Sequence, residues 1–199
     1  LFFLINELKN TFNMGPFALW GRSMGAATAI LCTSPLIACK VVDSAYTSIP
    51  DVCKAIATTV HVPPILHPGL VWYLKQKVST IAQYDISSVS PLNSAKDPNQ
   101  PPLLMCHSKT DEFVPYEQGV TIFEAYSNPD KEFREVQNGH NGSRGPEFNQ
   151  SAINFIMKHL GVDSNETEGV NSTTENQDAP AHFKSFNDMA QTAEQKEHD

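Results

Sequence analysis

The sequence has no run of apolar residues long enough to cross a membrane. It opens with an apolar segment, residues 1–5, but a spanning helix needs about 18 or more mainly apolar residues, and no stretch of the sequence reaches that length. The opening segment also lacks the charged start and the small-residue cleavage site of a secretory signal peptide. We therefore expect no transmembrane segment, and we expect a cytoplasmic location.

Cysteine is scarce, and its spacing argues against two kinds of site. The four cysteines are Cys32, Cys39, Cys53 and Cys106, and they form neither a Cys-x-x-Cys pair nor a zinc-binding spacing. The sequence also lacks the His-Glu-x-x-His pattern of zinc peptidases. We expect free, mostly buried thiols in a reducing compartment, no metal and no cofactor.

An excess of basic residues is missing as well. The net charge is −8, and residues 162–199 carry nine acidic residues but only two lysines, so the rest of the chain is close to neutral. This distribution shows no basic surface for nucleic acid and disfavours an anionic membrane. Because residues 162–199 have few large apolar side chains, we predict a disordered acidic tail there, after one globular domain over residues 1–161.

Within residues 1–161, short apolar runs alternate with helical patterns. The expected strands are residues 17–20, 40–43, 103–106 and 132–136, and the expected helices are residues 1–12, 23–34, 51–59, 70–80, 116–126 and 146–160. Buried short strands that alternate with helices predict an α/β fold, a mostly parallel sheet with helices on both faces. Such sheets place functional residues at the carboxyl ends of their strands.

The first expected strand leads into Gly21-Arg22-Ser23-Met24-Gly25 at the start of a helix. A Gly-x-Ser-x-Gly motif between a strand and a helix is typical of a nucleophile elbow, so Ser23 is the predicted nucleophile. A side chain at either glycine is expected to collide with the neighbouring strand or helix. The backbone N–H of Met24 is the expected oxyanion-hole donor.

An acid and a histidine follow the last two expected strands, in the chain order that a serine nucleophile of this kind requires. Asp111 is the predicted acid and His140 the predicted base. Two alternatives for the acid remain open. Glu112 is adjacent to Asp111, and Asp43 ends the second strand, where we expect it to have a structural role in capping the loop of residues 44–48.

A variable connection over about residues 47–100 separates the second strand from the third. Its apolar residues form either an acyl-binding site or part of the ordinary core; they are Val62, Ile65, Leu66, Leu70, Val71, Trp72 and Tyr73.

Four segments of the sequence resemble the α/β-hydrolase superfamily: Gly21–Gly25, Asp43-Ser44-Ala45, His107–Pro115 and Gly139-His140-Asn141. Within this superfamily, the sequence resembles the serine aminopeptidase S33-like or Bem46-like hydrolases. The resemblance covers about residues 1–160. It implies Ser23 as nucleophile, Asp111 as acid and His140 as base, with residues 47–100 over or beside the site. Members of the superfamily also carry earlier strands and a His-Gly loop that supplies a second oxyanion donor. Because no such loop precedes Ser23, we expect a C-terminal portion of the fold, incomplete at its N-terminus.

These expectations combine into a serine hydrolase that cleaves a small-molecule acyl ester or thioester through an acyl-enzyme, with amides and peptides less favoured. The alternatives are a non-catalytic hydrolase-fold protein that binds a partner, and an inactive fragment. The acidic tail and the missing earlier strands favour these alternatives, whereas the Ser-Asp-His set favours the enzyme.

Overall fold

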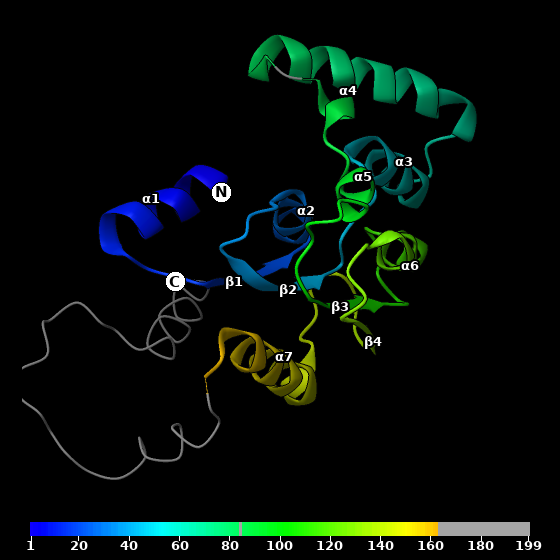
Figure 1. The fold of residues 1–199 in the computed structure, drawn as a ribbon. Coiled ribbons are helices and arrows are strands. Elements are labelled where there is room, and N and C mark those ends of the chain that lie inside the picture. Colours follow the sequence, from blue (N-terminus) through cyan, green and yellow to red (C-terminus); the bar gives the residue numbers. More distant parts are fainter. Residues whose placement is uncertain (84, 163–199) are drawn as a thin grey trace, which may run out of the picture. The chain divides into compact units, whose positions relative to one another are not determined.

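Residues 1–83 and 85–162 are described by a computed structural model, and their strands form one parallel sheet (Figure 1). The strands are β1 (Phe17–Arg22), β2 (Ile37–Asp43), β3 (Leu103–Ser108) and β4 (Lys131–Val136). They lie in the order β1-β2-β3-β4, and each neighbouring pair is parallel. The predicted α/β fold is therefore confirmed. The predicted tail lies outside the described residues, apart from Val162, and stays a prediction.

Burial differs between the inner and the outer strands. Every residue of β3 is buried and only one residue of β2 is partly exposed, whereas β1 and β4 contain both partly and fully exposed residues. Inner strands of a parallel sheet are covered on both faces, which explains why β2 and β3 read as nearly continuous apolar runs.

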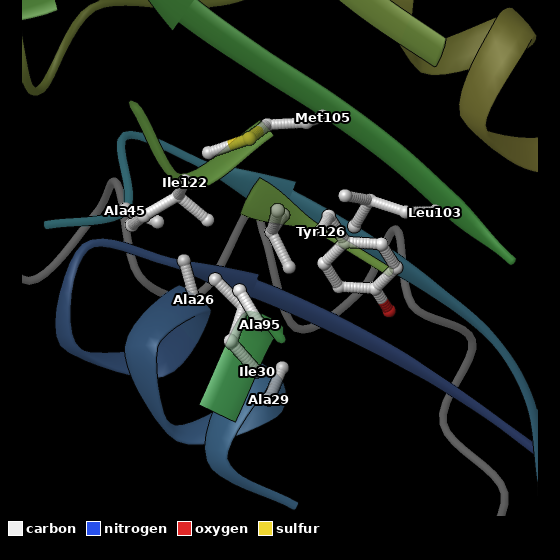
Figure 2. Close-up of a cluster of buried hydrophobic side chains, with 10 residues drawn as sticks. Ala26, Ala29, Ile30, Ala45, Ala95, Leu103, Met105, Ile122 and Tyr126 are labelled. Carbon is white, nitrogen blue, oxygen red and sulfur yellow. The ribbon is translucent and has the colours of Figure 1, made fainter. Parts of the chain in front are cut away.

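Successive residues of a strand point to opposite faces of the sheet, and the two faces are covered by different helices. On one face, α2 (Met24–Leu31), α5 (Pro91–Ala95) and α6 (Tyr116–Ala125) pack against Leu103 and Met105 (Figure 2). On the other face, α7 (Gly145–Leu160) packs against Leu104 and Cys106 through Phe148, Ala152 and Phe155. The carboxyl ends of the strands are thereby held between two apolar layers.

Helices also occupy the N-terminal segment and the connection between β2 and β3. They are α1 (Phe2–Phe12), α3 (Ile49–Thr59) and α4 (His67–Ala82), with 3₁₀ turns η1 (Pro64–Leu66) and η2 (Ile86–Ser88). The sequence patterns predicted all three α-helices to within a few residues but missed α5, which has only five residues. All four cysteines are free, and three of them are buried. Among the described residues, no helix is long and apolar enough to span a membrane.

Candidate active site

Ser23 lies in a tight turn between β1 and α2. Its backbone angles are φ 52° and ψ −114°, and a positive φ at a non-glycine residue costs on the order of 1–3 kcal/mol unless its surroundings hold it. Two backbone hydrogen bonds hold this turn: the N–H of Ser23 donates to the carbonyl of Asp43 (2.8 Å), and its carbonyl accepts from the N–H of Ala27 (3.0 Å). The turn between β1 and α2 therefore holds Ser23 in a strained backbone conformation.

The two glycines of this turn differ in their surroundings. A Cβ added at Gly21 would collide with the backbone of Gly25, as the sequence predicts. A Cβ added at Gly25 would meet no described atom within 4 Å, so the prediction of a collision at Gly25 is wrong. The reason is that Gly21 faces the first turn of α2, whereas Gly25 lies on the exposed side of that turn.

The structure brings Ser23, His140 and Asp111 together from the loops that follow β1, β4 and β3. His140 Nε2 lies 3.0 Å from Ser23 Oγ, and His140 Nδ1 lies 2.8 Å from Asp111 Oδ2. The side chain of Asp111 is inaccessible to solvent. A hydrogen bond from Nδ1–H to this carboxylate leaves the lone pair of Nε2 facing the serine hydroxyl.

Asp111 is held by its own loop as well as by His140. Its Oδ1 accepts hydrogen bonds from the backbone N–H groups of Phe113 (3.0 Å) and Val114 (2.8 Å). Burial alone would raise the pKa of Asp111, but hydrogen bonds from Val114, His140, Ser44 and Phe113 outweigh it and hold the pKa below its usual value. The loop thus keeps a charged carboxylate beside the histidine ring.

Glu112, the first alternative for the acid, contacts the backbone of the histidine loop. Its Oε2 accepts a hydrogen bond from the backbone N–H of His140 at 3.1 Å. A Cβ added at Gly139 would require this carboxylate to move. Glu112 therefore fixes the main chain of His140, while Asp111 contacts its ring.

Asp43, the second alternative, is buried and paired with two arginines. Its Oδ2 accepts from Arg22 Nε at 2.5 Å and from Arg144 Nε at 2.8 Å. As expected, Asp43 contacts the loop of residues 44–48, because the hydroxyl of Ser44 lies 3.1 Å from its Oδ1. The hydroxyls of Thr47 and Ser48 donate instead to Asp51, in the first turn of α3, so the expectation that Asp43 caps these two residues is wrong.

Arg144 is a buried charged residue beside the site that the sequence analysis missed. It is the N-cap residue of α7, a position where the helix dipole disfavours a positive charge. An arginine at the start of a helix, four residues after a candidate base, therefore signals a compensating acid elsewhere in the fold. The sequence does not show which acid pairs with this arginine, because the partner, Asp43, lies 101 residues away along the chain.

His107 lies behind the acid. Its Nε2 donates to the carbonyl of Val114 at 2.9 Å and lies 3.6 Å from Asp111 Oδ2. Burial lowers the pKa of His107, which favours the neutral form of the ring. A Cβ added at Gly119 of α6 would collide with this ring.

The apolar residues of the connection do not form a closed core. Ile65 is 86% exposed and Trp72 is 63% exposed, and Leu66 and Tyr73 are also exposed, whereas Val71 is only 8% exposed. The alternative of an ordinary core is therefore wrong for these four exposed side chains. In the part of the chain that the structure describes, no group of three or more His, Cys, Asp or Glu side chains is placed to hold a metal ion.

Residues 66–163 match the sequence profile of the prolyl oligopeptidase family. This segment contains Asp111 and His140 but not Ser23. It points to that family rather than specifically to the S33-like or Bem46-like hydrolases, and it does not support the expectation that peptides are less favoured substrates. No curated protein matches the chain.

Solved structures share the fold at low sequence identity. The esterase domain of a Rhodothermus marinus protein has a TM-score of 0.55 and 18% identity over 79% of this chain and 67% of that domain. A Pyrococcus furiosus esterase has a TM-score of 0.51 and 22% identity over 78% of this chain and 58% of the esterase. A puromycin-hydrolyzing peptidase of Mycobacterium tuberculosis has a TM-score of 0.58 and 15% identity over 80% of this chain and 24% of the peptidase.

The chain therefore spans only part of the length of each of these proteins. These identities show the fold alone. We conclude that the chain has the α/β fold of these hydrolases and that its residues 66–163 match the prolyl oligopeptidase family.

Proposed function

We propose that this chain carries the catalytic centre of a serine hydrolase, with Ser23 as nucleophile, His140 as base and Asp111 as orienting acid. The observation that carries the proposal is the pair of contacts on His140, at 3.0 Å to Ser23 Oγ and 2.8 Å to Asp111 Oδ2. A nucleophile, a base and an acid in hydrogen-bond reach of one another are the arrangement that nucleophilic acyl transfer requires.

In the proposed reaction, His140 takes the hydroxyl proton while Ser23 Oγ attacks the acyl carbonyl. The tetrahedral intermediate breaks when His140 gives this proton to the leaving group, and an acyl-enzyme remains. Water then attacks the acyl group, His140 takes its proton, and the acid product leaves as Ser23 regains a proton. Asp111 orients the ring and stabilises its charged form.

The developing oxyanion is stabilised from the start of α2. Met24 is the first residue of this helix, and its backbone N–H is the proposed oxyanion donor. The N-terminus of a helix favours negative charge, which adds to the effect of this N–H.

The proposed substrate class is a carboxylic ester, a thioester or an amide of an acyl group. The match to the prolyl oligopeptidase family supports this proposal, and it is the reason for including peptide bonds in the substrate class. The structures with the same fold include esterases and a peptidase that hydrolyses puromycin. The exposed apolar side chains of the connection, among them Trp72 and Tyr73, form the proposed contact surface for the acyl group.

The test is labelling of the full chain with a fluorophosphonate, which reacts only with an activated serine. We expect the wild-type chain to be labelled and the Ser23→Ala variant to be unlabelled, since loss of a triad serine costs on the order of a million-fold in kcat. The matched control is Ser79→Ala, because Ser79 is an exposed serine of α4. This variant should be labelled at the wild-type rate.

If the chain is folded by circular dichroism and remains unlabelled, the proposal that this chain carries a working catalytic centre is wrong. Either alternative, a non-catalytic hydrolase-fold protein or an inactive fragment, would then replace it. If Ser23→Ala is still labelled, the nucleophile is a different residue.

A further inference from the structure

Arg144 and Asp43 form a buried ion pair outside the proposed catalytic set. Their side chains are only 2% and 3% exposed, and Arg144 Nε lies 2.8 Å from Asp43 Oδ2. Neither residue has a role in the proton transfers described above. Removing two charges from water is costly unless both are paired and their other hydrogen bonds are satisfied. The other hydrogen bonds of Arg144 and Asp43 therefore show which parts of the chain the pair holds in place.

Every N–H of the Arg144 guanidinium has an acceptor. Besides Nε, Nη1 donates to the carbonyls of Asn138 (3.3 Å) and Gly139 (2.9 Å). Nη2 donates to the carbonyl of His140 and to Ser44 Oγ, both at 3.1 Å. One side chain therefore holds the three consecutive carbonyls that end at the proposed base.

Asp43 makes the corresponding contacts with the nucleophile turn. Its carbonyl accepts the N–H of Ser23, and its Oδ2 accepts from Arg22 Nε as well as from Arg144. Arg22, which precedes the nucleophile, and Arg144, which lies four positions after the base, thus both donate to the same carboxylate oxygen of Asp43.

Ser44 extends the same contacts to the acid. Its hydroxyl accepts from Arg144 Nη2, and its hydrogen bond with Asp111 helps to hold the pKa of that carboxyl below its usual value. The loops of the nucleophile, the acid and the base therefore all meet at Asp43 and Ser44, at the end of β2.

The backbone at this meeting point is strained. Ser23, Ser44 and Asn138 are non-glycine residues with φ values of 52°, 53° and 70°. Such conformations persist only where surrounding contacts hold them. Arg144 contacts Ser44 and Asn138 directly, and Asp43 contacts Ser23, so this ion pair supplies contacts at all three positions.

We propose that Asp43 and Arg144 are positioning residues, which set the distance between Ser23 Oγ and His140 Nε2 by fixing both loops to the end of β2. This inference rests on the proposed function for its kinetic consequence. Its structural consequence, the placement of the His140 ring beside Asp111, can be measured without turnover.

The test compares Arg144→Lys with Arg134→Lys in the full chain. Lysine retains the charge and can still pair with Asp43, but it has three rotatable donors instead of a planar fork of five. Arg134 is the matched control, since its side chain is 54% exposed and pairs only with Glu132 among the ion pairs of the described residues.

The kinetic measurement is hydrolysis of a p-nitrophenyl ester, with thermal unfolding of each variant as a check on folding. We expect kcat of Arg144→Lys to fall about 10- to 100-fold with KM within about twofold, because small misplacements of catalytic groups act on the chemical step. Arg134→Lys should keep the wild-type kcat. In Arg144→Ala, added methylguanidinium should restore part of kcat, whereas methylammonium should not.

The structural measurement is the NMR signal of the Nδ1 proton of His140, which its hydrogen bond to Asp111 shifts downfield in the wild type. We expect Arg144→Lys to weaken or remove this signal while Arg134→Lys retains it. An unchanged signal in a folded Arg144→Lys variant would overturn the inference, and so would an unchanged kcat. If the wild-type chain shows no Ser23-dependent turnover, the proposed function fails, and the NMR comparison alone decides the positioning role.

Discussion

The loops at the carboxyl ends of the strands and the helical connection of residues 47–100 differ in what they bury. In the strand-end loops, charged side chains such as Asp43, Asp111 and Arg144 are removed from solvent, and each is paired. In the connection, large apolar side chains such as Ile65 and Trp72 are exposed. The normal distribution of polar and apolar groups is thus reversed in both regions.

This reversal separates two tasks. A buried polar network fixes distances, because each group would be costly to leave unpaired. An exposed apolar surface fixes no distance, but it offers area to an apolar ligand. We therefore expect substitutions in the strand-end loops to change the rate of the chemical step, and substitutions in the connection to change stability or substrate preference.

Among the substitutions that compare the two regions, the largest effect is expected for Asp111→Asn. The amide retains the shape of the carboxyl group but favours the wrong tautomer of His140, which costs about 10⁴-fold in kcat in a comparable triad. The measurement is kcat for a p-nitrophenyl ester, together with stability as a function of pH. Because its folded pKa lies below the ordinary value of 3.8, Asp111 stabilises the wild type above that pH. This contribution is lost as the pH falls through the folded pKa and is absent in the variant.

The matched control for this prediction is Asp51→Asn in the connection. Asp51 also has a lowered pKa, since hydrogen bonds from Ser48, Thr47 and Lys54 outweigh the effect of burial. It lies in the first turn of α3, and its side chain is hydrogen-bonded to Thr47, Ser48 and Lys54. This variant should lose some stability and retain kcat. An equal loss of kcat in both variants would contradict the separation of tasks.

An intermediate effect is expected for a pair of glycine substitutions, one in each region. A Cβ at Gly119 would collide with the buried ring of His107 behind Asp111, so Gly119→Ala should cost about 1–3 kcal/mol. A Cβ at Gly69 in α4 would meet no described atom within 4 Å, so Gly69→Ala should be neutral or stabilise the helix by up to about 1 kcal/mol. Denaturant unfolding of both variants measures the difference. Equal stabilities would show that the loop behind Asp111 is not tightly packed.

The strands and the proposed catalytic set could be predicted from the sequence because their signals are local. The apolar runs of β2 and β3 reflect burial on both faces, and the turn at Ser23 is marked by a glycine on each side. Asp111 and His140 could be proposed because each lies in the loop that follows a strand, in the order that the chemistry requires.

The contacts that hold these residues could not be predicted, because they join distant parts of the chain. Arg144 and Asp43 are 101 residues apart, and Glu112 and His140 are 28 residues apart. A sequence motif shows that a turn exists but not which carboxylate lies next to it. Gly25 shows an error of another kind. The motif predicts a collision for a side chain at this position, but a Cβ there would meet no described atom within 4 Å.

The smallest effect on stability is expected in the connection, where Val71 and Trp72 are neighbours in α4 with opposite burial. Val71 is 8% exposed and Trp72 is 63% exposed. Val71→Ala should therefore cost about 1–2 kcal/mol for the lost apolar burial, whereas Trp72→Ala should change stability by less than about 0.5 kcal/mol.

The same pair of variants tests whether the exposed surface contacts the acyl group of the substrate. If it does, Trp72→Ala should lower kcat/KM for long-chain p-nitrophenyl esters several-fold and leave the acetate unchanged, because the acetate has no chain to contact the indole. Val71→Ala should change both esters equally, since a buried side chain presents no contact area. Unfolding curves and a series of esters of increasing chain length provide both measurements. A large loss of stability in Trp72→Ala would show that the indole is covered in solution. An unchanged chain-length profile would remove the connection from the proposed acyl site and leave the chemistry of Ser23 unaffected.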